Sequence, residues 1–234
     1  AFELATLNDV DAIVTVTPED AATYGNLGAK IPVHVAPVGI DTDDYSDRSG
    51  HGDPLTLVFL GSLDWRPNIE AVRWFLESTW PIVKQSVPGA RFLLGGSNPP
   101  AALEGLPQPE GVRVLGRVPD AREFLASGTA MVVPLLSGGG MRVKILEAMA
   151  LGIPVISTKL GAAGIGARDG SEILLADDPG ALAAACVNLL LDATRAATIG
   201  RAGRQYIHEV FDASKIGRRL FETLENEVRR PRPA

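Results

Sequence analysis

The sequence has little of several residue types that mark particular classes of protein. Of its 234 residues, one is cysteine, three are histidine and 6% are aromatic. A single cysteine, Cys186, excludes an intrachain disulfide, and the apolar run around it predicts a buried thiol rather than a nucleophile. His34, His51 and His208 are too scattered for the spacing of a metal site. The sequence therefore disfavours a disulfide scaffold, a thiol enzyme and a histidine-based metal centre.

Basic charge and long apolar runs are also scarce. The chain has 22 Lys and Arg against 28 Asp and Glu, which gives a net charge of -6. Such an acidic balance does not favour a nucleic-acid partner. No apolar run is long enough to span a bilayer, so we expect no transmembrane segment. With 46% hydrophobic residues and no disulfide, the chain is typical of a globular protein on the cytoplasmic side of a membrane.

From residue 54 onward, short apolar runs alternate with helical patterns. Apolar strands that alternate with helices predict a parallel sheet covered on both faces, here a doubly wound, Rossmann-like α/β domain of about six strands. The expected strands are 55–61, 91–96, 112–116, 130–135, 154–158 and 173–175. The expected helices are a long one from 68 to about 87, a short one at 121–126, one that starts near Gly140, and two or three from 179 to about 229.

Glycines end one predicted strand after another, at Gly61, Gly95, Gly96, Gly116 and 138–140. In a parallel sheet these turns lie on the same edge, where ligands of doubly wound folds bind. Glycine lets a ligand approach the backbone closely, so we expect a ligand there. The alternative is that glycine is simply common in turns between strands and helices.

The segment after the fourth expected strand carries the strongest chemical signal. Three glycines, Gly138, Gly139 and Gly140, precede a helical pattern, and unshielded amides at a helix N-terminus favour an anion. Lys144 and Glu147 follow on the same helix face as Gly140. Amides and a cation suit a diphosphate, and a carboxylate suits the vicinal hydroxyls of a ribose. The alternative is a solvated Lys144–Glu147 surface pair, which is common and weak.

Residues 138–158 strongly resemble the donor-site signature of the retaining glycosyltransferases of the GT-B fold, the group 1 family. Glycines, Glu147, Gly152 and Pro154 fall in register with it. The resemblance implies that 54–228 is the C-terminal, nucleotide-sugar donor-binding half of a GT-B fold. Residues 1–53 then resemble a remnant of the N-terminal acceptor domain with the interdomain linker, and 229–234 is expected to be a disordered tail.

The family's signature has two glutamates separated by seven residues. Glu147 matches the second, which binds the ribose hydroxyls of the donor, whereas Gly139 stands in place of the first, which touches the donor sugar. Family members also carry an Arg and a Lys that contact the diphosphate after the first strand. Here Arg66 lies only near that Lys position, and we hypothesise that Arg142 and Lys144 replace the missing charges.

The other donor-binding assignments rest on the same resemblance. Gly116 and Arg117 match the loop whose backbone contacts the base, and Trp65 is expected to line the donor cleft. Lys159 is equally consistent with a ligand contact and with a solvated lysine. No catalytic residue is assigned. The expected donor-binding residues are Gly61, Arg66, Gly116, Arg117, Gly138, Gly139, Gly140, Met141, Arg142, Lys144 and Glu147.

The resemblance implies transfer of a sugar from a nucleotide-diphosphate sugar to an unknown acceptor, in surface polysaccharide or glycoconjugate synthesis. No cofactor or metal is expected, because cations and a helix end would stabilise the departing diphosphate. The acceptor and any general base would come mostly from the missing domain, so this chain alone is expected to bind nucleotide but turn over little. That domain would also make any peripheral contact with the inner membrane.

Three other functions remain open. A nucleotide-sugar epimerase has the same architecture, but such enzymes carry further acid and base residues in the cleft. A non-catalytic nucleotide-sugar-binding module is suggested by Gly139 in place of a glutamate. A nicotinamide dehydrogenase is disfavoured, because Gly61 stands alone where a Gly-x-Gly-x-x-Gly would follow the first strand.

Overall fold

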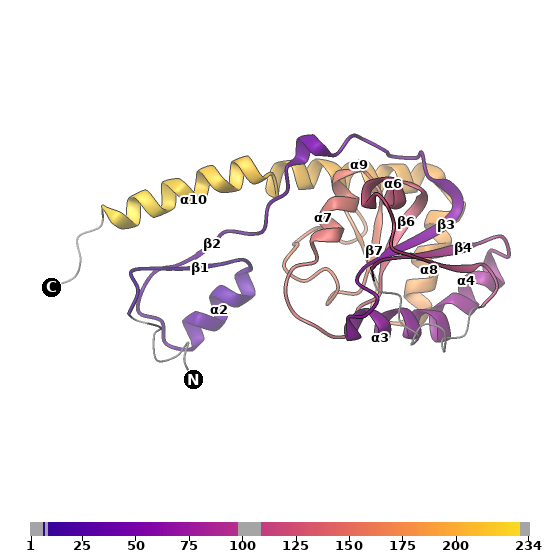
Figure 1. Ribbon diagram of the computed structural model, residues 1–234, viewed down its shortest axis with the longest axis horizontal. Coiled ribbons are helices and arrows are strands. Elements are labelled where there is room, and N and C mark those ends of the chain that lie inside the picture. The colour runs from indigo at the N-terminus through magenta and orange to yellow at the C-terminus, as the bar shows by residue number, and fades with distance from the viewer. Residues whose placement is uncertain (1–6, 8, 98–108, 230–234) are drawn as a thin grey trace.

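The computed structural model describes residues 7, 9–97 and 109–229 and has two parts of unequal size (Figure 1). The smaller part contains β1 (Ile13–Thr15), α2 (Pro18–Asn26) and β2 (Val33–Val35). Its two strands pair in parallel. The C-terminal helix α10 (Ala213–Val228) leaves the larger part and extends over the smaller one, where His34 Nε2 lies 3.2 Å from Glu227 Oε1.

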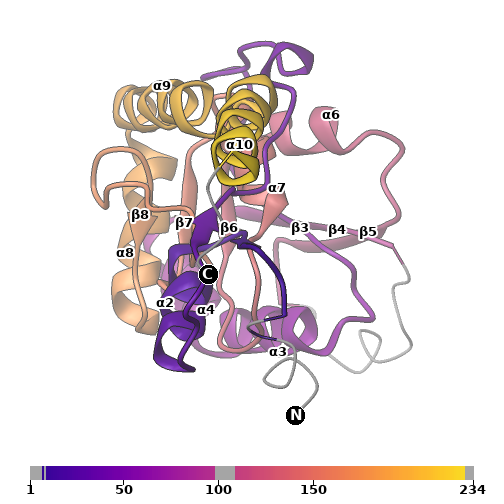
Figure 2. The ribbon, with the colours of Figure 1, turned by 90° about the vertical axis from the view of Figure 1, so that its left-hand side faces the viewer.

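The larger part is built on a six-stranded sheet in the order β5-β4-β3-β6-β7-β8, with every neighbouring pair parallel. Figure 2 shows β4 and β5 on one side of β3, and β6, β7 and β8 on the other. The strands are β3 (Asp53–Leu60), β4 (Arg91–Gly95), β5 (Val112–Gly116), β6 (Gly128–Val133), β7 (Val155–Ser157) and β8 (Leu174–Leu175). This is the doubly wound order, so the predicted fold class is confirmed.

Helices cover both faces of the sheet, because successive side chains of a strand point to opposite sides. In β3, Leu57 and Phe59 join one buried cluster, whereas Val58 and Leu60 join the other. The first cluster includes residues of α3 (Arg66–Trp74), α4 (Trp80–Ser86) and α8 (Pro179–Leu191). The second includes residues of α6 (Ala121–Ala126), α7 (Val143–Ala150) and α9 (Ala193–Val210). Cys186 is fully buried in the first cluster, as predicted.

Two predicted helices differ from those observed. The expected helix from 68 to about 87 is interrupted by a π-helical turn at Phe75–Thr79, just before Pro81. Proline lacks an amide donor, so the regular hydrogen-bond ladder cannot continue through it. The helix expected to start near Gly140 begins at Val143. Gly138 and Gly140 adopt positive φ angles of 101° and 79°, so the glycines form a loop before the helix.

The two segments that join the parts lie side by side. Ile40 N donates to Phe211 O at 2.9 Å, and Ala213 N donates to Ile40 O at 2.9 Å. In the short 3-10 helix η1 (Thr42–Asp44), Thr42 Oγ1 donates to Asp212 Oδ2 at 2.6 Å. The predicted tail at 229–234 lies outside the described residues except for Arg229.

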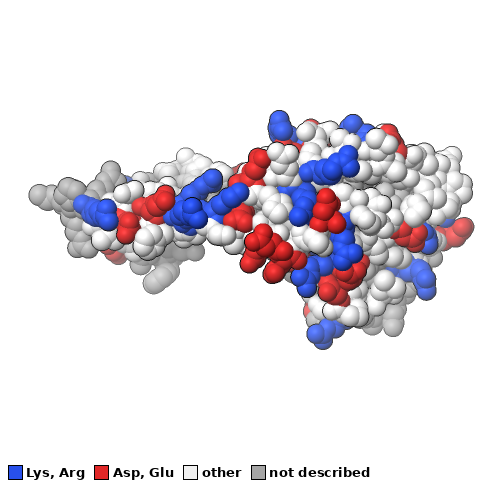
Figure 3. All heavy atoms as spheres, turned by 90° about the horizontal axis from the view of Figure 1, so that it is seen from above, with Lys and Arg blue, Asp and Glu red and all other residues white. Residues whose placement is uncertain are grey.

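Acidic and basic side chains are interspersed along α10 and the adjoining domain on the face seen in Figure 3. Within the described ranges, no single helix is long and apolar enough to cross a membrane. The pair α8 and α9 reaches that length and composition together but bends by 105° at its junction.

Candidate functional site

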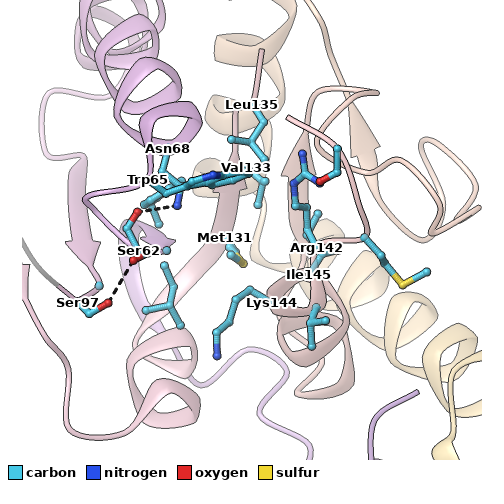
Figure 4. A pocket seen from close by; sticks show the side chains of 17 residues that line it. Ser62, Trp65, Asn68, Ser97, Met131, Val133, Leu135, Arg142, Lys144 and Ile145 are labelled. Carbon is cyan, nitrogen blue, oxygen red and sulfur yellow. Dashed lines mark hydrogen bonds between the residues drawn. The ribbon is translucent and has the colours of Figure 1, made fainter. Parts of the chain in front are cut away.

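A cavity of about 500 Å³ opens where β3 and β6 end. The chain crosses over between these neighbouring strands, which is where doubly wound sheets bind ligands. Figure 4 shows Ser62 and Trp65 on one wall and Arg142 on the other, with Lys144 and Ile145 below it. Buried apolar side chains form its floor: Phe59, Leu60, Met131, Val133 and Leu135.

The wall formed by the turns after β3 and β4 is tightly packed. Gly61 N donates to Gly95 O at 3.1 Å, and a Cβ at Gly96 would lie 1.7 Å from Gly61 O. Only glycine therefore allows the two turns to meet. Asn68 Nδ2 donates to Ser62 O at 2.8 Å, and Ser62 Oγ lies 3.3 Å from the Ser97 hydroxyl. Small polar groups thus stand at fixed positions along this wall.

The opposite wall is the start of α7. Arg142 occupies the N-cap position but makes no capping hydrogen bond with its side chain, and the first turn has no acidic residue. Arg142, Val143, Lys144 and Ile145 all line the cavity. Because the first amides of a helix lack partners within it and carry the positive end of its dipole, this wall favours an anion.

The side chain of Arg142 folds back over this helix start. Its Cζ lies 5.6 Å from the ring centroid of Trp65, close enough for a cation–π contact. Nη1 donates to Gly139 O at 2.6 Å and also to Gly140 O. Nε and Nη2 are buried without a partner among the described residues, and burial lowers the pKa of Arg142. Buried donors without an acceptor are costly, so Arg142 has hydrogen-bonding capacity that no described residue uses.

In the first turn of α7, Lys144 lines the same cavity. Its Nζ lies 2.7 Å from Glu147 Oε2, and the two side chains are 44% and 17% exposed. The surface pair considered from the sequence therefore forms, but its carboxylate is mostly buried. Burial and the nearby Glu147 carboxylate raise the pKa of Tyr45 to about 12.

The structure brings part of the predicted donor-binding set together. Gly61, Gly139, Met141, Arg142 and Lys144 line the cavity, as does Trp65. Gly138 and Gly140 lie in the loop that carries Gly139, and Glu147 lies one turn beyond Lys144.

Six of the eleven predicted residues do not line the cavity themselves, namely Gly138, Gly140, Glu147, Arg66, Gly116 and Arg117, and neither does Lys159. Arg66 is 88% exposed and pairs with Glu70 at 2.7 Å. Gly116 ends β5, where its carbonyl accepts from Gly96 N at 2.8 Å, and Arg117 next to it is exposed. Lys159 is exposed and lies 3.5 Å from Asp177 Oδ2.

Sequence reasoning missed Ser62, Asn68 and Ser97 in the wall and Tyr45 beside Glu147. Ser97 directly follows the Gly95-Gly96 turn, so the position of that turn was an available signal. No local pattern connects Tyr45 to Glu147, because the two are far apart in the sequence. Within 9–97 and 109–229, no group of three or more His, Cys, Asp or Glu side chains has the geometry to hold a metal ion.

Comparison with known proteins agrees with this geometry. A mannosyltransferase from Mycolicibacterium smegmatis, described as GDP-mannose-dependent and acting on phosphatidylinositol monomannoside, is 27% identical over 93% of this chain and 63% of its own length. Sucrose-phosphate synthase from Thermosynechococcus elongatus superposes with a TM-score of 0.78 at 22% identity, covering 96% of this chain and 60% of the other. HepE from Anabaena, solved with UDP and glucose, gives 0.75 at 18% identity, covering 96% and 66%.

These likenesses show the fold as that of the GT-B glycosyltransferases. The chain spans between 45% and 63% of the length of the curated relatives that it matches. The family model described as glycosyl transferases group 1 matches residues 54–192, more than half of the chain and the whole sheet. The chain therefore belongs to the group 1 glycosyl transferases.

Proposed function

We propose that this chain binds the donor of a glycosyltransferase that moves a sugar from a nucleotide-diphosphate sugar to an acceptor of surface polysaccharide or glycoconjugate synthesis. Family membership supports the reaction class, and the relative from Mycolicibacterium smegmatis is named as a GDP-mannose-dependent enzyme of this type. HepE, a structural neighbour, was solved with UDP and glucose.

The observation that carries the proposal is the pair of buried, unpartnered donors on Arg142 at the uncapped start of α7. A diphosphate in the cavity accepts hydrogen bonds from the first amides of the helix and, after a rotation of the Arg142 side chain, from Nε and Nη2. Lys144 Nζ has three donors, so it contacts a phosphate oxygen while keeping its bond to Glu147. These groups favour a doubly charged ligand over a neutral one.

The same groups explain how the site would assist transfer. As the bond between the anomeric carbon and the diphosphate oxygen breaks, negative charge develops on the departing diphosphate. Arg142, Lys144 and the α7 amides are fixed before the reaction and stabilise that charge in a cavity with an apolar floor. The protein's own cations thus neutralise the leaving group, and the proposed mechanism needs no metal.

Glu147 serves the ribose in this proposal. It lies further along α7 than the diphosphate-binding residues, and its carboxylate is mostly buried. A carboxylate accepts hydrogen bonds from two vicinal hydroxyls without charge conflict. The order along α7, first cations and then carboxylate, follows the order of diphosphate and ribose in a nucleotide.

Calorimetry with Lys144→Ala tests the proposal. The affinity for UDP or GDP should fall about tenfold, the effect of one lost charge-assisted hydrogen bond, while that for the matching nucleoside changes less than about twofold. Lys159→Ala, which removes an exposed lysine outside the cavity, is the matched control. Equal losses for nucleotide and nucleoside would contradict the proposal.

Product analysis distinguishes sugar transfer from epimerisation of the nucleotide sugar. The longest natural form of the protein is incubated with a nucleotide sugar labelled in the sugar, together with candidate acceptors. Transfer places the label on the acceptor and releases nucleoside diphosphate. An epimerase would leave the label on an altered nucleotide sugar, and binding without either product would indicate a non-catalytic module.

A further inference from the structure

The two walls of the cavity are joined by a contact between two side chains. Trp65 stands at the N-cap position of α3 and Arg142 at that of α7. Figure 4 shows the indole on one wall extending toward the guanidinium on the other. Arg142 Cζ lies 5.6 Å from the ring centroid, within the range of a cation–π contact. Trp65 is 40% exposed, so the contact lies at a solvent-accessible part of the cavity.

The backbone that carries Arg142 is fastened to the wall opposite. Ser137 Oγ donates to Glu70 Oε2 at 3.1 Å, which ties the loop of residues 137–142 to α3. Arg66 Nε donates to the other oxygen of Glu70 at 2.7 Å. Hydrogen bonds from Arg66 and Ser137 lower the pKa of Glu70, so its carboxylate is ionised at neutral pH. Any change in the contact with Trp65 therefore falls on the side chain of Arg142 rather than on its backbone.

Arg142 is poorly satisfied in the position where it contacts Trp65. Nη1 donates to Gly139 O and Gly140 O, but Nε and Nη2 are buried without a partner among the described residues. These two nitrogens form one edge of the guanidinium, and such an edge makes paired hydrogen bonds with a carboxylate or a phosphate. Because buried donors without an acceptor are costly, a stronger acceptor can draw the side chain away from the ring.

A diphosphate offers Arg142 more than the indole does. Phosphate oxygens carry negative charge and accept two hydrogen bonds at once, whereas the face of the ring only attracts a cation. The two positions of Arg142 exclude each other, because Nε and Nη2 are covered in the first and bonded to the ligand in the second. The apparent affinity for a nucleotide is then reduced by the fraction of molecules in which Arg142 stays on Trp65.

We propose that Trp65 is a positioning residue, which holds Arg142 in a resting position until a diphosphate enters the cavity and withdraws it. The inference rests on the proposed function, since it assumes that a nucleoside diphosphate occupies the cavity. Trp65 acts through Arg142, and its ring opposes the binding of phosphate-bearing ligands. Its removal therefore strengthens the binding of a nucleoside diphosphate and not that of a nucleoside.

The first test is the affinity of Trp65→Leu, which removes the ring and keeps an apolar side chain. UDP and GDP are titrated by calorimetry into the full 234-residue chain, followed by the nucleoside of whichever binds more tightly. The diphosphate should bind about two- to fivefold more tightly than in the wild type, the factor of one exposed cation–π contact. An equal gain for the nucleoside would mean that the ring merely narrows the cavity, and would overturn the inference.

A variant pair shows whether the gain passes through Arg142. In an Arg142→Met background, which keeps the length of the side chain without its charge, Trp65→Leu should leave the affinity for the diphosphate unchanged, because the two residues act as a unit. A gain that persists in this background would contradict the role assigned to Trp65. Trp65→Met is a second variant without a ring should Trp65→Leu fold poorly.

The emission of Trp65 provides a second test that does not depend on affinity. Of the three tryptophans, Trp80 is fully buried and Trp74 packs against the first buried cluster. Saturating UDP or GDP should change the emission of the wild type, because the guanidinium leaves the indole. Trp65→Phe should lose this change while still binding, and Trp74→Phe, the matched control, should keep it. A change of full size in Arg142→Met would mean that the nucleotide itself touches the indole, which would overturn the inference.

The outcomes separate the two proposals. If neither UDP nor GDP binds to the wild type, the proposed function fails and the inference with it. If the diphosphate binds and Lys144→Ala weakens it as expected, but Trp65→Leu and Trp65→Met bind it no more tightly than the wild type, the proposed function stands and the resting role of Trp65 is overturned.

Discussion

The helices of this protein begin in two ways. Most open with a Thr or Asp whose side chain accepts a hydrogen bond from a first-turn amide, whereas α3 and α7 open without one, as does α4, which continues directly from the π-helical turn. The capped helices are α2, α6, α8, α9 and α10, with Thr17, Asp120, Asp178, Asp192 and Asp212 as caps. Among the described helices that follow a loop, the two uncapped ones, α3 and α7, begin at the cavity, where Trp65 and Arg142 stand at the N-cap positions.

This difference shows which helix ends serve the fold and which serve a ligand. A capping side chain contributes about 1 kcal/mol to stability, and a cation at a helix N-terminus opposes the helix dipole. Helix α7 lacks the stabilisation of a capping side chain and carries an unfavourable cation at its N-terminus, because Arg142 stands at the N-cap position. An anion in the cavity would accept hydrogen bonds from the first amides and offset the positive charge of Arg142, which is why the uncapped start fits the proposed diphosphate site.

The largest expected effect comes from giving α7 a cap. Arg142→Asp converts its start into that of α8 or α10, so the free energy of unfolding should rise by about 1 kcal/mol. Binding of UDP or GDP should fall at least about 100-fold, because a carboxylate then takes the amides and repels phosphate. Denaturant unfolding and calorimetry measure the two changes. Arg142→Ala separates loss of the cation from reversal of charge, and undiminished binding by Arg142→Asp would refute the diphosphate site.

The loop that leads into α7 provides the next largest effect. Gly140 has a φ of 79°, whereas Gly139 lies outside that region, and a Cβ would meet nothing within 4 Å at either position. Gly140→Ala should therefore destabilise the protein by about 1–2 kcal/mol through backbone strain. Gly139→Ala is the control and should stay within about 0.5 kcal/mol of wild type. Equal losses in thermal unfolding would mean that strain does not shape this loop.

The opposite experiment removes a cap far from the cavity. In Asp178→Ala, α8 loses the acceptor of the Ala181 amide, and unfolding in denaturant should show a loss of about 1 kcal/mol. Nucleotide affinity should not change by more than about twofold, because α8 contributes nothing to the cavity lining. A large loss of affinity would erase the distinction between the two kinds of helix start.

The smallest effect concerns charge at a capped helix. Hydrogen bonds from Thr42 and the Lys215 amide lower the pKa of Asp212 from 3.8 to about 2. The resulting stability is present above pH 4 and is lost as the pH falls toward 2. Asp212→Asn keeps a capping oxygen, so it should cost about 0.5 kcal/mol at pH 7 after solvent screening. Denaturant unfolding at pH 7, 4 and 2 should show the difference shrinking, and a constant difference would contradict this origin.

Most of the fold was predictable because it depends on local patterns. Runs such as 55–61 and 130–135 are apolar throughout, as strands covered on both faces must be. The interruption at Phe75–Thr79 was not predicted, since the apolar spacing continues through it and only Pro81 signals the break. The late start of α7 depends on the φ angles of Gly138 and Gly140, and glycine permits both a helix end and a loop.

Site residues that belong to one segment of the chain were predictable, whereas contacts between distant segments were not. Gly139, Met141, Arg142 and Lys144 belong to one segment, and the structure places all of them at the cavity. Contacts between distant segments leave no such pattern. The contact of Arg142 with Trp65 and the approach of Tyr45 to Glu147 arise only when the turn after β3, α7 and the linker are brought together by the sheet.

The fastening of the linker to the start of α10 has a mechanical consequence. Ile40 is bonded on both sides to the corner between α9 and α10, and Thr42 to Asp212. Both chain crossings between the smaller and larger parts thus meet at one pivot, so any swing of the smaller part bends the protein there. Tyr45 follows this pivot by a single 3-10 turn. Arg204 Nη1 donates to its carbonyl oxygen at 2.7 Å, so Tyr45 is fastened to the larger part and a swing of the smaller part would leave it in place.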